Sequence, residues 1–253
     1  MNVDRRPIFE AVRQLRRGEG FTVEEVRMLD AAIDRAFADV HRDSEAPPAF
    51  NEAAFFDVMR GSKALGPTLS TDEVEGCQAI IEACRQAGYA LSWTAYALAT
   101  AVVETASTMQ PIKEFGGTAY FRRMYDIEGS RPAKARELGN LNPGDGARFA
   151  GRGYVQLTGR KNYAKAGTAL GHDLIGNPDL AMRPDIAAAI MVKGMAGGWF
   201  TGRSLAGYLP ANGPGALIQF KEARRIINGQ DRAAEIAGYA MECQRALQAG
   251  GWA

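Results

Sequence analysis

Two carboxylates, Glu104 and Glu114, lie in the stretch of this sequence whose residue types and spacing best suit catalysis. Glu104 interrupts an apolar run that begins at Ala95 and predicts a helix. Partly apolar surroundings disfavour the charged form of a carboxylate, which suits a general acid. On one helical face its neighbours are all small, so the face should leave room for a ligand; they are Ala97, Thr100, Ala101 and Thr108.

The residues after Glu104 predict a break in this helix. Pro111 removes a backbone hydrogen bond and disfavours helix in the residue before it, so we expect the helix to end near Gln110. In one straight helix the two carboxylates would lie about 15 Å apart, and a break brings Glu114 closer. Two carboxylates roughly 6.5–9.5 Å apart suit an inverting glycosidase. The alternative is a buried Glu104 held by a structural partner and a Glu114 on the surface.

Length and composition place the chain among ordinary globular proteins. Its 253 residues fit one large domain, or one domain with a small appendage, and 46% hydrophobic with 23% charged residues is typical of a soluble protein. No apolar run reaches the roughly 18 residues of a transmembrane helix, and the first residues lack the apolar core of a signal peptide. We therefore expect a protein made in the cytoplasm.

Cysteine and histidine usage gives no reason to expect a metal or another cofactor. Cys77, Cys84 and Cys243 form no metal-binding pattern, and their odd number predicts free thiols. Only two histidines are present, His41 and His172, so neither a histidine zinc site nor a Ser-His triad is supported.

The chain contains a basic segment although its net charge is only +1. Residues 113–165 contain eleven Lys or Arg and five Asp or Glu. A basic cleft there would favour an anionic partner, while a solvated basic surface is the alternative reading. No nucleic-acid recognition motif accompanies the charge, so we do not expect nucleic acid as a partner, and we expect a monomer.

The N-terminal third contains a degenerate repeat. F-E-A-V-R at 9–13 and T-V-E-E-V at 22–26 return as F-D-V-M-R at 56–60 and S-T-D-E-V at 70–74. Each copy predicts a short helix, a turn and a second helix that starts at a capping box. The proline-containing segment 43–50 predicts a linker. We therefore place a helical appendage at 1–45, either a small binding or docking module or a helical pair packed on the main domain, and a main domain at 50–253.

The rest of the chain predicts a mainly α protein with a little β structure. Residues 115–153 are rich in glycine and polar residues, and the segments 128–132, 142–146 and 150–153 within them predict loops. The alternation over 154–158 predicts a short strand. Helices are expected from about Asn162, from Asp185 to Trp199, and over two C-terminal segments, 220–228 and 233–249.

Several of these segments together resemble glycoside hydrolase family 19, the family of plant-type chitinases and many bacteriophage endolysins. They occur in order over residues 50 to 253, and the long glycine-rich block is the most specific of them. The motifs are A-T-A-V-V-E-T, M-Q-P-I-K-E-F-G-G, M-Y-D-I-E-G-S-R-P, P-G-D-G-A-R-F-A-G-R-G-Y-V-Q-L-T-G-R-K-N-Y, G-N-P-D-L, G-W-F-T-G and A-R-R-I-I-N-G. The resemblance implies a lysozyme-like or chitinase-like, two-lobed helical domain with a small β element and a cleft between the lobes, and it is strongest to the phage endolysin branch.

The resemblance also assigns roles. Glu104 matches the general acid, and Glu114 matches the second carboxylate of the endolysin branch. In the chitinase branch that carboxylate lies further downstream, so Asp126 and Glu128 stay open as the base. Thr158 occupies the position of the hydroxyl that helps to hold the attacking water.

A further set of residues is expected to line the sugar cleft. Gln156 and Asn228 match polar cleft residues of the family, and we add Tyr154, Lys113 and Arg152 to the expected substrate-binding set. Two positions depart from the family pattern. Val103 stands where many members have histidine, and Glu235 stands where the chitinase branch has an arginine, a role that Arg225 could take over.

These features imply an endolysin that hydrolyses the β-1,4 glycan of peptidoglycan by an inverting mechanism. A chitinase and a non-catalytic wall-binding protein are the alternatives. The basic segment favours peptidoglycan, because muramic acid carries a carboxylate and chitin is neutral. An endolysin made in the cytoplasm would need a holin-type permeabiliser to reach the cell wall.

Overall fold

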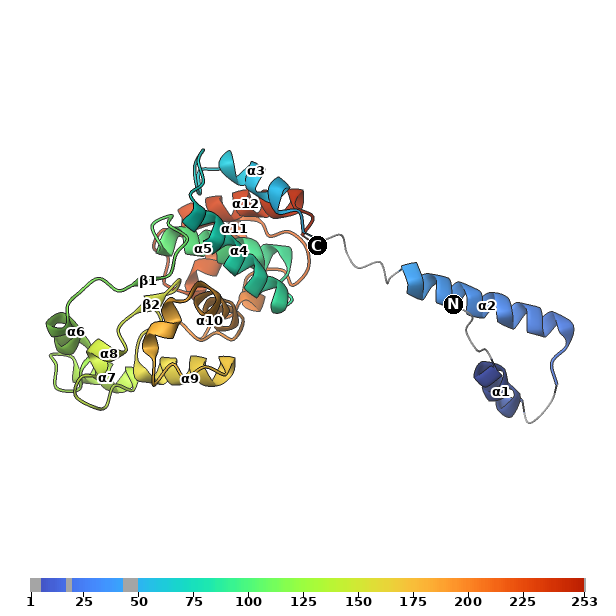
Figure 1. The fold of residues 1–253 in the computed structure, drawn as a ribbon, viewed down its shortest axis with the longest axis horizontal. Coiled ribbons are helices and arrows are strands. Elements are labelled where there is room, and N and C mark those ends of the chain that lie inside the picture. The colour runs from blue at the N-terminus through green and yellow to red at the C-terminus, as the bar shows by residue number, and fades with distance from the viewer. Residues whose placement is uncertain (1–5, 17–19, 43–49, 253) are drawn as a thin grey trace. The chain divides into compact units, whose positions relative to one another are not determined.

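The structure of the protein, a computed structural model, describes residues 6–16, 20–42 and 50–252 (Figure 1). It divides into two compact units, Met1–Ala49 and Phe50–Ala253. Apart from Phe50, the linker predicted at 43–50 lies outside the described residues.

The first unit contains the helices α1 (Arg6–Leu15) and α2 (Val23–Arg42). The predicted capping box starts α2: the Thr22 backbone N–H donates to Glu25 Oε2 at 2.8 Å, and the Glu25 N–H donates to Thr22 Oγ1 at 3.3 Å. Phe9 and Phe21 pack edge to face with ring centroids 5.6 Å apart. The first repeat copy therefore forms the predicted pair of helices.

The second repeat copy forms α3 (Glu52–Arg60) and α4 (Thr71–Gln86). Ser70 and Glu73 form the reciprocal capping box at the start of α4, as predicted. Both helices contribute buried side chains to the main hydrophobic core of the second unit.

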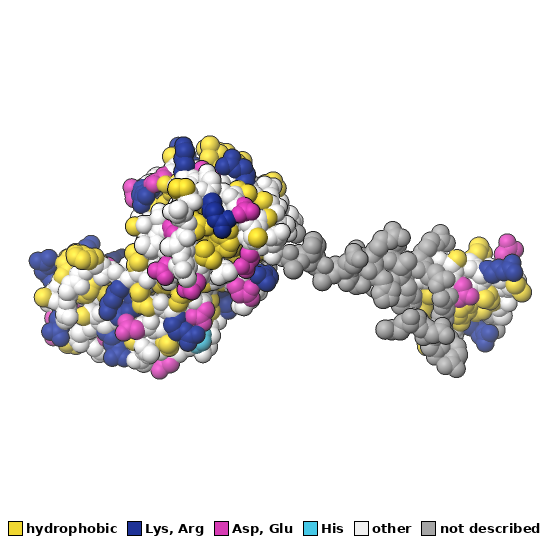
Figure 2. Space-filling view, turned by 45° about the horizontal axis from the view of Figure 1, so that its top comes forward, with side chains coloured by type: hydrophobic (Ala, Val, Ile, Leu, Met, Phe, Trp, Pro, Cys, Tyr) yellow, Lys and Arg dark blue, Asp and Glu magenta, His cyan; other side chains and the backbone are white. Residues whose placement is uncertain are grey.

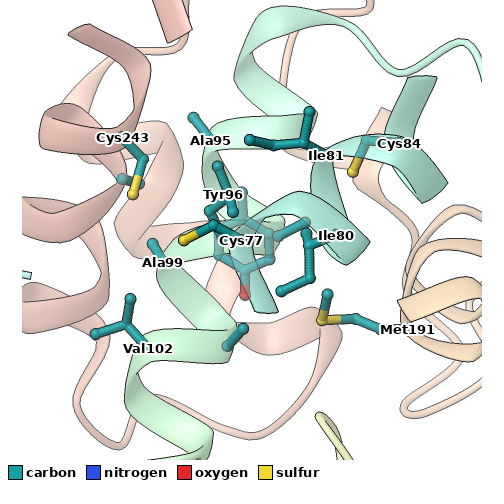
Figure 3. Close-up of a cluster of buried hydrophobic side chains, with 14 of the residues drawn as sticks. Cys77, Ile80, Ile81, Cys84, Ala95, Tyr96, Ala99, Val102, Met191 and Cys243 are labelled. Carbon is teal, nitrogen blue, oxygen red and sulfur yellow. The ribbon is translucent and has the colours of Figure 1, made fainter. Parts of the chain in front are cut away.

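Helix α5 (Leu91–Glu104) lies at the centre of that core. It packs against α4 and α12 (Ala233–Ala249), while α10 (Pro184–Ala196) packs on α4 and α11 (Leu217–Ala223) packs on α12. Every residue of α5 from Leu91 to Val103 except Trp93 is buried. Figure 3 shows Tyr96, Ala99 and Val102 of α5 among side chains of the surrounding helices, including Cys77, Met191 and Cys243. All three cysteines are free and buried, as the odd number predicts.

A second, smaller core lies in the other lobe of this unit, around Phe149, Tyr163 and Leu174. The helices of this lobe are α6 (Thr118–Tyr125), α7 (Pro132–Leu138), α8 (Asp145–Arg148) and α9 (Arg160–Leu170), of which α9 contributes Tyr163 to the core. Figure 1 shows this lobe below the helices around α5, with α10 between the two. The first three helices are short. Pro132, at the end of the loop predicted over 128–132, starts α7, and Gly139 ends it with a left-handed φ of 72°. The loop predicted over 142–146 is shorter than expected, because α8 starts within it at Asp145.

A two-stranded antiparallel sheet lies between the lobes (Figure 1). It pairs β1 (Ile112–Lys113) with β2 (Arg152–Gly153), with Ile112 opposite Gly153. The prediction of a strand over 154–158 is wrong. Gln156 adopts a left-handed φ of 53°, so the chain turns there. Leu157 then forms a single antiparallel bridge with Arg152.

The remaining elements follow the predictions closely. The helices α9, α10 and α12 begin within two residues of the predicted starts, and the segment 220–228 consists of the end of α11 followed by a 3₁₀ turn, η3 (Arg224–Ile226). Two further 3₁₀ turns are η1 (Pro178–Met182) and η2 (Leu205–Gly207). The mainly α, two-lobed architecture with a small β element is therefore confirmed.

The surface carries charges of both signs. Figure 2 shows Lys and Arg interspersed with Asp and Glu over the visible face of residues 50–252. Within the described residues, none of the helices combines the length and apolarity needed to cross a bilayer.

Candidate active site

Glu104 is the last residue of α5, and its side chain is 21% exposed. The helix ends here and not near Gln110 as predicted. Ala106, Ser107 and Met109 all adopt left-handed backbone conformations, with φ between 51° and 67°. The Thr105 hydroxyl also accepts the Met109 N–H at 3.0 Å, which fixes the new chain direction. The break therefore comes from the residues directly after Glu104, and it leaves Glu104 at the tip of a buried helix.

The partner of Glu104 is Arg224, at the start of η3. Its Nη1 lies 2.6 Å from Glu104 Oε1, and its Nε donates to the Asp231 carbonyl oxygen at 2.9 Å. Arg224 is only 3% exposed. The expected open face beside Glu104 is therefore wrong: Ala97, Thr100 and Ala101 are buried in the core, and an arginine contacts the carboxylate.

Glu114 follows β1 and is held by two donors from the smaller lobe. The Tyr125 hydroxyl donates to Glu114 Oε1 at 2.7 Å, and the Gly151 N–H donates to Oε2 at 3.0 Å. Burial and the neighbouring Glu114 charge raise the pKa of Tyr125, so this phenol stays a hydrogen-bond donor at all ordinary pH values. Glu114 is thus a half-buried, fixed carboxylate and not a free surface residue.

Gly151 brings Glu114 and Gln156 together. A Cβ at this position would lie 2.7 Å from Gln156 Oε1 and 3.1 Å from Glu114 Oε2, so only glycine allows both oxygens to approach the backbone here. The Gln156 amide Nε2 donates to the carbonyl oxygens of Ile112 at 3.1 Å and Gly153 at 3.3 Å. These bonds orient Gln156 so that its oxygen faces the same point as the Glu114 carboxylate.

Thr158 lies two residues further on, and its hydroxyl donates to the Gln156 carbonyl oxygen at 2.8 Å. Because the single hydroxyl hydrogen is used in this bond, the lone pairs of Thr158 Oγ1 are left to accept hydrogen bonds. A water molecule could donate one of its protons to Thr158 and the other to a carboxylate.

A cavity of about 320 Å³ adjoins this group. Its walls include Tyr125, Gln156 and Thr158 together with Phe200 and Ile227, which pack against the larger core. The cavity therefore lies between the two lobes. Neither Glu104 nor Glu114 lines it, and Tyr125 connects it to Glu114.

Three other predicted site residues have structural roles. Tyr154 is fully buried and donates to the Met109 carbonyl oxygen, so it cannot contact a sugar in this structure. Arg152 is 5% exposed; it binds Asp179 at 2.8 Å and backbone carbonyls at 3.0 Å. Asp126 is equally buried and accepts the N–H groups of Gly144 and Gly146. Their burial argues against direct contact of Tyr154 and Arg152 with a sugar in this structure, and burial together with the two N–H donors makes Asp126 a poor base.

The other predicted residues are exposed. Lys113 and Asn228 lie on the surface, Asn228 with its side-chain oxygen accepting the Gly229 N–H, and Glu128 is also exposed. Arg225, proposed as a substitute arginine, pairs with Glu222 at 2.6 Å, and Glu235 pairs with Arg232. The arginine that forms an ion pair with Glu104 is Arg224, the first of the two arginines in A-R-R-I-I-N-G.

Sequence reasoning missed two contacts of the carboxylates, Arg224 and Tyr125. Both stand inside motifs that the resemblance rests on, A-R-R-I-I-N-G and M-Y-D-I-E, but nothing in their spacing shows which carboxylate they reach. In the described part of the chain, no group of three or more His, Cys, Asp or Glu side chains is placed to hold a metal ion.

Comparison with known proteins finds similarity to one family over part of the chain. Residues 95–204 match the family model of glycoside hydrolase family 19, described as class I chitinase. Acidic endochitinase Q of Nicotiana tabacum is 64% identical over 33 residues, 13% of each chain. Chitinase 8 of Oryza sativa subsp. japonica is 55% identical over 40 residues, 16% of this chain and 15% of that protein. These matches therefore span only about a seventh of the length of the curated relatives.

Among solved structures, chitinase C from Streptomyces griseus HUT6037 superposes with a TM-score of 0.47 at 20% identity, covering 79% of this chain and 76% of that one. A bacterial family 19 chitinase superposes with a TM-score of 0.43 at 20% identity, covering 81% and 96%. The segment matched by the family model contains Glu104, Glu114 and Thr158. The chain is therefore similar to glycoside hydrolase family 19 over residues 95–204, less than half of its length.

Proposed function

We propose that the protein is an inverting glycosidase that hydrolyses the β-1,4 glycan of bacterial peptidoglycan. The observation that carries the proposal is the pair of carboxylates, Glu104 and Glu114, each fixed by named donors, with the free lone pairs of Thr158 on the same turn as Gln156. A glycosidase needs one carboxylic acid to protonate the leaving oxygen and one carboxylate to activate water.

In this proposal Glu104 is the general acid. Arg224 binds its Oε1, which leaves Oε2 to carry the proton that passes to the glycosidic oxygen. The position of Glu104 at the tip of α5 holds this oxygen in place, because the helix behind it is buried.

Glu114 is the general base. It takes one proton from a water molecule that donates its other proton to Thr158 Oγ1, and the oxygen of that water forms the new bond to the anomeric carbon while the bond to the leaving oxygen breaks. Attack from the face opposite the leaving group inverts the anomer, so a β-linked substrate gives an α product.

The target glycan is proposed from charge. Several basic residues of segment 113–165 are paired, as in Arg160–Asp145 and Lys134–Glu137, but Arg122, Arg123 and Lys165 are exposed and lie in no ion pair of the described chain. A basic surface favours a glycan with acidic substituents. The second candidate is a chitinase, favoured by the family model and by the chitinase names of the similar proteins.

Hydrolysis assays separate the two candidates. Reducing-sugar release from purified peptidoglycan should exceed release from colloidal chitin, and the reverse order would favour the chitinase. Proton NMR of freshly released sugar should show the α anomer first. A β anomer would require a covalent intermediate and carboxylates about 5–5.5 Å apart, which would overturn the roles of Glu114 and Thr158.

Access to the wall through a membrane opened by a holin-type partner stays a prediction. Expression of the protein alone should then leave cells intact, and addition of a permeabiliser should lyse them. Rapid lysis without a permeabiliser would contradict it.

A further inference from the structure

The cavity beside Thr158 contains a cation that forms no ion pair with a carboxylate of the described residues. Three ionisable side chains with a formal charge at neutral pH line it: Lys134, Glu137 and Lys165. Lys134 Nζ lies 2.9 Å from Glu137 Oε1, so these two charges compensate each other. Lys165 forms no ion pair with any described residue, and its charge therefore sets the net charge of the cavity.

Lys165 is nevertheless held in place. Its Nζ lies 5.0 Å from the centroid of the Trp199 ring, a cation–π contact, and Trp199 itself lines the cavity. Thr158 also lines the cavity, and its carbonyl oxygen accepts the Asn162 amide at 2.7 Å. Asn162 and Lys165 are both on α9, so one helix connects the hydroxyl of the candidate site to the unpaired ammonium.

We propose that Lys165 binds an acidic substituent of the glycan, and so makes the cavity selective for peptidoglycan over neutral β-1,4 glycans. This inference rests on the proposed function. In peptidoglycan every second sugar carries a lactyl ether extended by a peptide with free carboxylates, and a chain of chitin carries no charge. A sugar bound against Thr158 would direct such a substituent into the adjoining cavity, where Lys165 offers three N–H donors and Trp199 offers an apolar ring face.

The test compares binding of an acidic and a neutral saccharide. Full-length protein with Glu104→Gln, which prevents turnover, is titrated calorimetrically with the N-acetylglucosaminyl–N-acetylmuramyl tetrapeptide and with chitotetraose. Adding Lys165→Gln should weaken binding of the acidic fragment roughly fivefold, the upper range for a partly exposed ion pair. Binding of chitotetraose should stay unchanged.

Two further variants control for structure. Lys165→Arg keeps the charge and the contact with Trp199, and should restore binding of the acidic fragment. Lys161→Gln removes an exposed charge from the same helix without touching the cavity, and should change neither ligand. The Lys165-dependent part of the affinity should fall as sodium chloride is raised.

The outcomes separate this inference from the proposed function. Equal weakening of both ligands by Lys165→Gln, or no weakening of either, would overturn the role of Lys165. If the wild-type protein hydrolyses neither glycan, the proposed function fails, while the binding comparison still decides the role of Lys165.

Discussion

Glu104 and Arg224 form an ion pair of 2.6 Å across 120 residues of sequence, between the tip of α5 and the turn that follows α11. The arginine is almost completely buried and the carboxylate is partly exposed. The pair therefore fixes one carboxylate oxygen against a rigid base, and in the proposed mechanism the other oxygen carries the acid proton. Substitution of Glu104 should therefore lower mainly the hydrolysis rate, and substitution of Arg224 should lower both the rate and the stability.

Glu104→Gln should lower the hydrolysis rate by roughly 10²–10⁴-fold, because an amide cannot donate the acid proton. The protein should remain folded, since the Gln oxygen can still accept the Arg224 N–H. Rates on peptidoglycan and thermal unfolding by circular dichroism check this. Arg224→Lys is the companion variant: it keeps the charge but loses the bond to Asp231, and should lower both the rate and the melting temperature. A folded Gln variant with wild-type activity would remove Glu104 from the mechanism.

Substitutions around Glu114 should form a graded series. Glu114→Gln should lose most activity, because a neutral amide cannot take a proton from water. Thr158→Val keeps the shape and removes the acceptor oxygen, so we expect a smaller loss with little change in melting temperature. Tyr125→Phe removes one hydrogen bond to a charged group, worth about 1.5–3 kcal/mol, and should also reduce activity. Glu128→Gln serves as the control, and a loss larger than that of Glu114→Gln would make Glu128 the base.

Gly76→Ala should destabilise the protein by about 1–3 kcal/mol through overpacking. A Cβ at Gly76 of α4 would fall on the carbonyl oxygen of Met109, in the segment that joins the two carboxylates, and a backbone atom cannot move aside. Gly238→Ala in α12 is the matched control: no atom lies within 4 Å of its added Cβ, so stability should be unchanged or up to about 1 kcal/mol higher. Urea unfolding of both variants measures the difference, and equal stability of the two would contradict the packing described.

Asp145 should make stability depend on pH. Its burial would raise its pKa, but the bonds from Arg160 and the Asn142 N–H outweigh this and lower the pKa below its usual value. A carboxylate with a depressed pKa in the folded state stabilises the protein above its unfolded pKa of about 3.9, and this contribution is lost as pH falls through the folded value. The stability deficit of Asp145→Asn should therefore be full at neutral pH and shrink below about pH 4. A deficit independent of pH would show that packing, and not charge, is lost.

Deletion of residues 1–45 should preserve cleavage of small soluble glycan fragments, because the second unit contains both hydrophobic cores and all the candidate site residues. Activity on soluble fragments and the melting temperature of the truncated protein are the measurements. A truncated protein that fails to fold would mean that the two repeat copies depend on each other.

Local signals in the sequence predicted the helical framework well. The capping boxes at Thr22 and Ser70 each satisfy backbone donors within four residues, so a short window of sequence contains the whole interaction. The bounds of α12 were also predicted correctly, at 233–249.

The geometry of the candidate site depends on contacts between residues that are distant in sequence, so local patterns did not predict it. Pro111 pointed to a helix end near Gln110, but left-handed residues just after Glu104 end the helix earlier, because the Thr105 hydroxyl and the packing of Met109 against Gly76 fix the chain there. The alternating pattern over 154–158 likewise gave no sign that Gln156 would turn toward Gly151. The ion pair with Arg224 joins segments that only the complete core brings together.

Helix α10 belongs to both hydrophobic cores. Ile186 and Ile190 pack into the smaller core, while Ala188 and Met191 pack into the larger one. Because both cores pack against this helix, unfolding of either lobe would expose apolar side chains of the other. Residues 50–252 should consequently unfold in a single cooperative transition, and any widening of the cavity between the lobes has to come from the loops around Tyr125 and Trp199 and not from separation of the lobes.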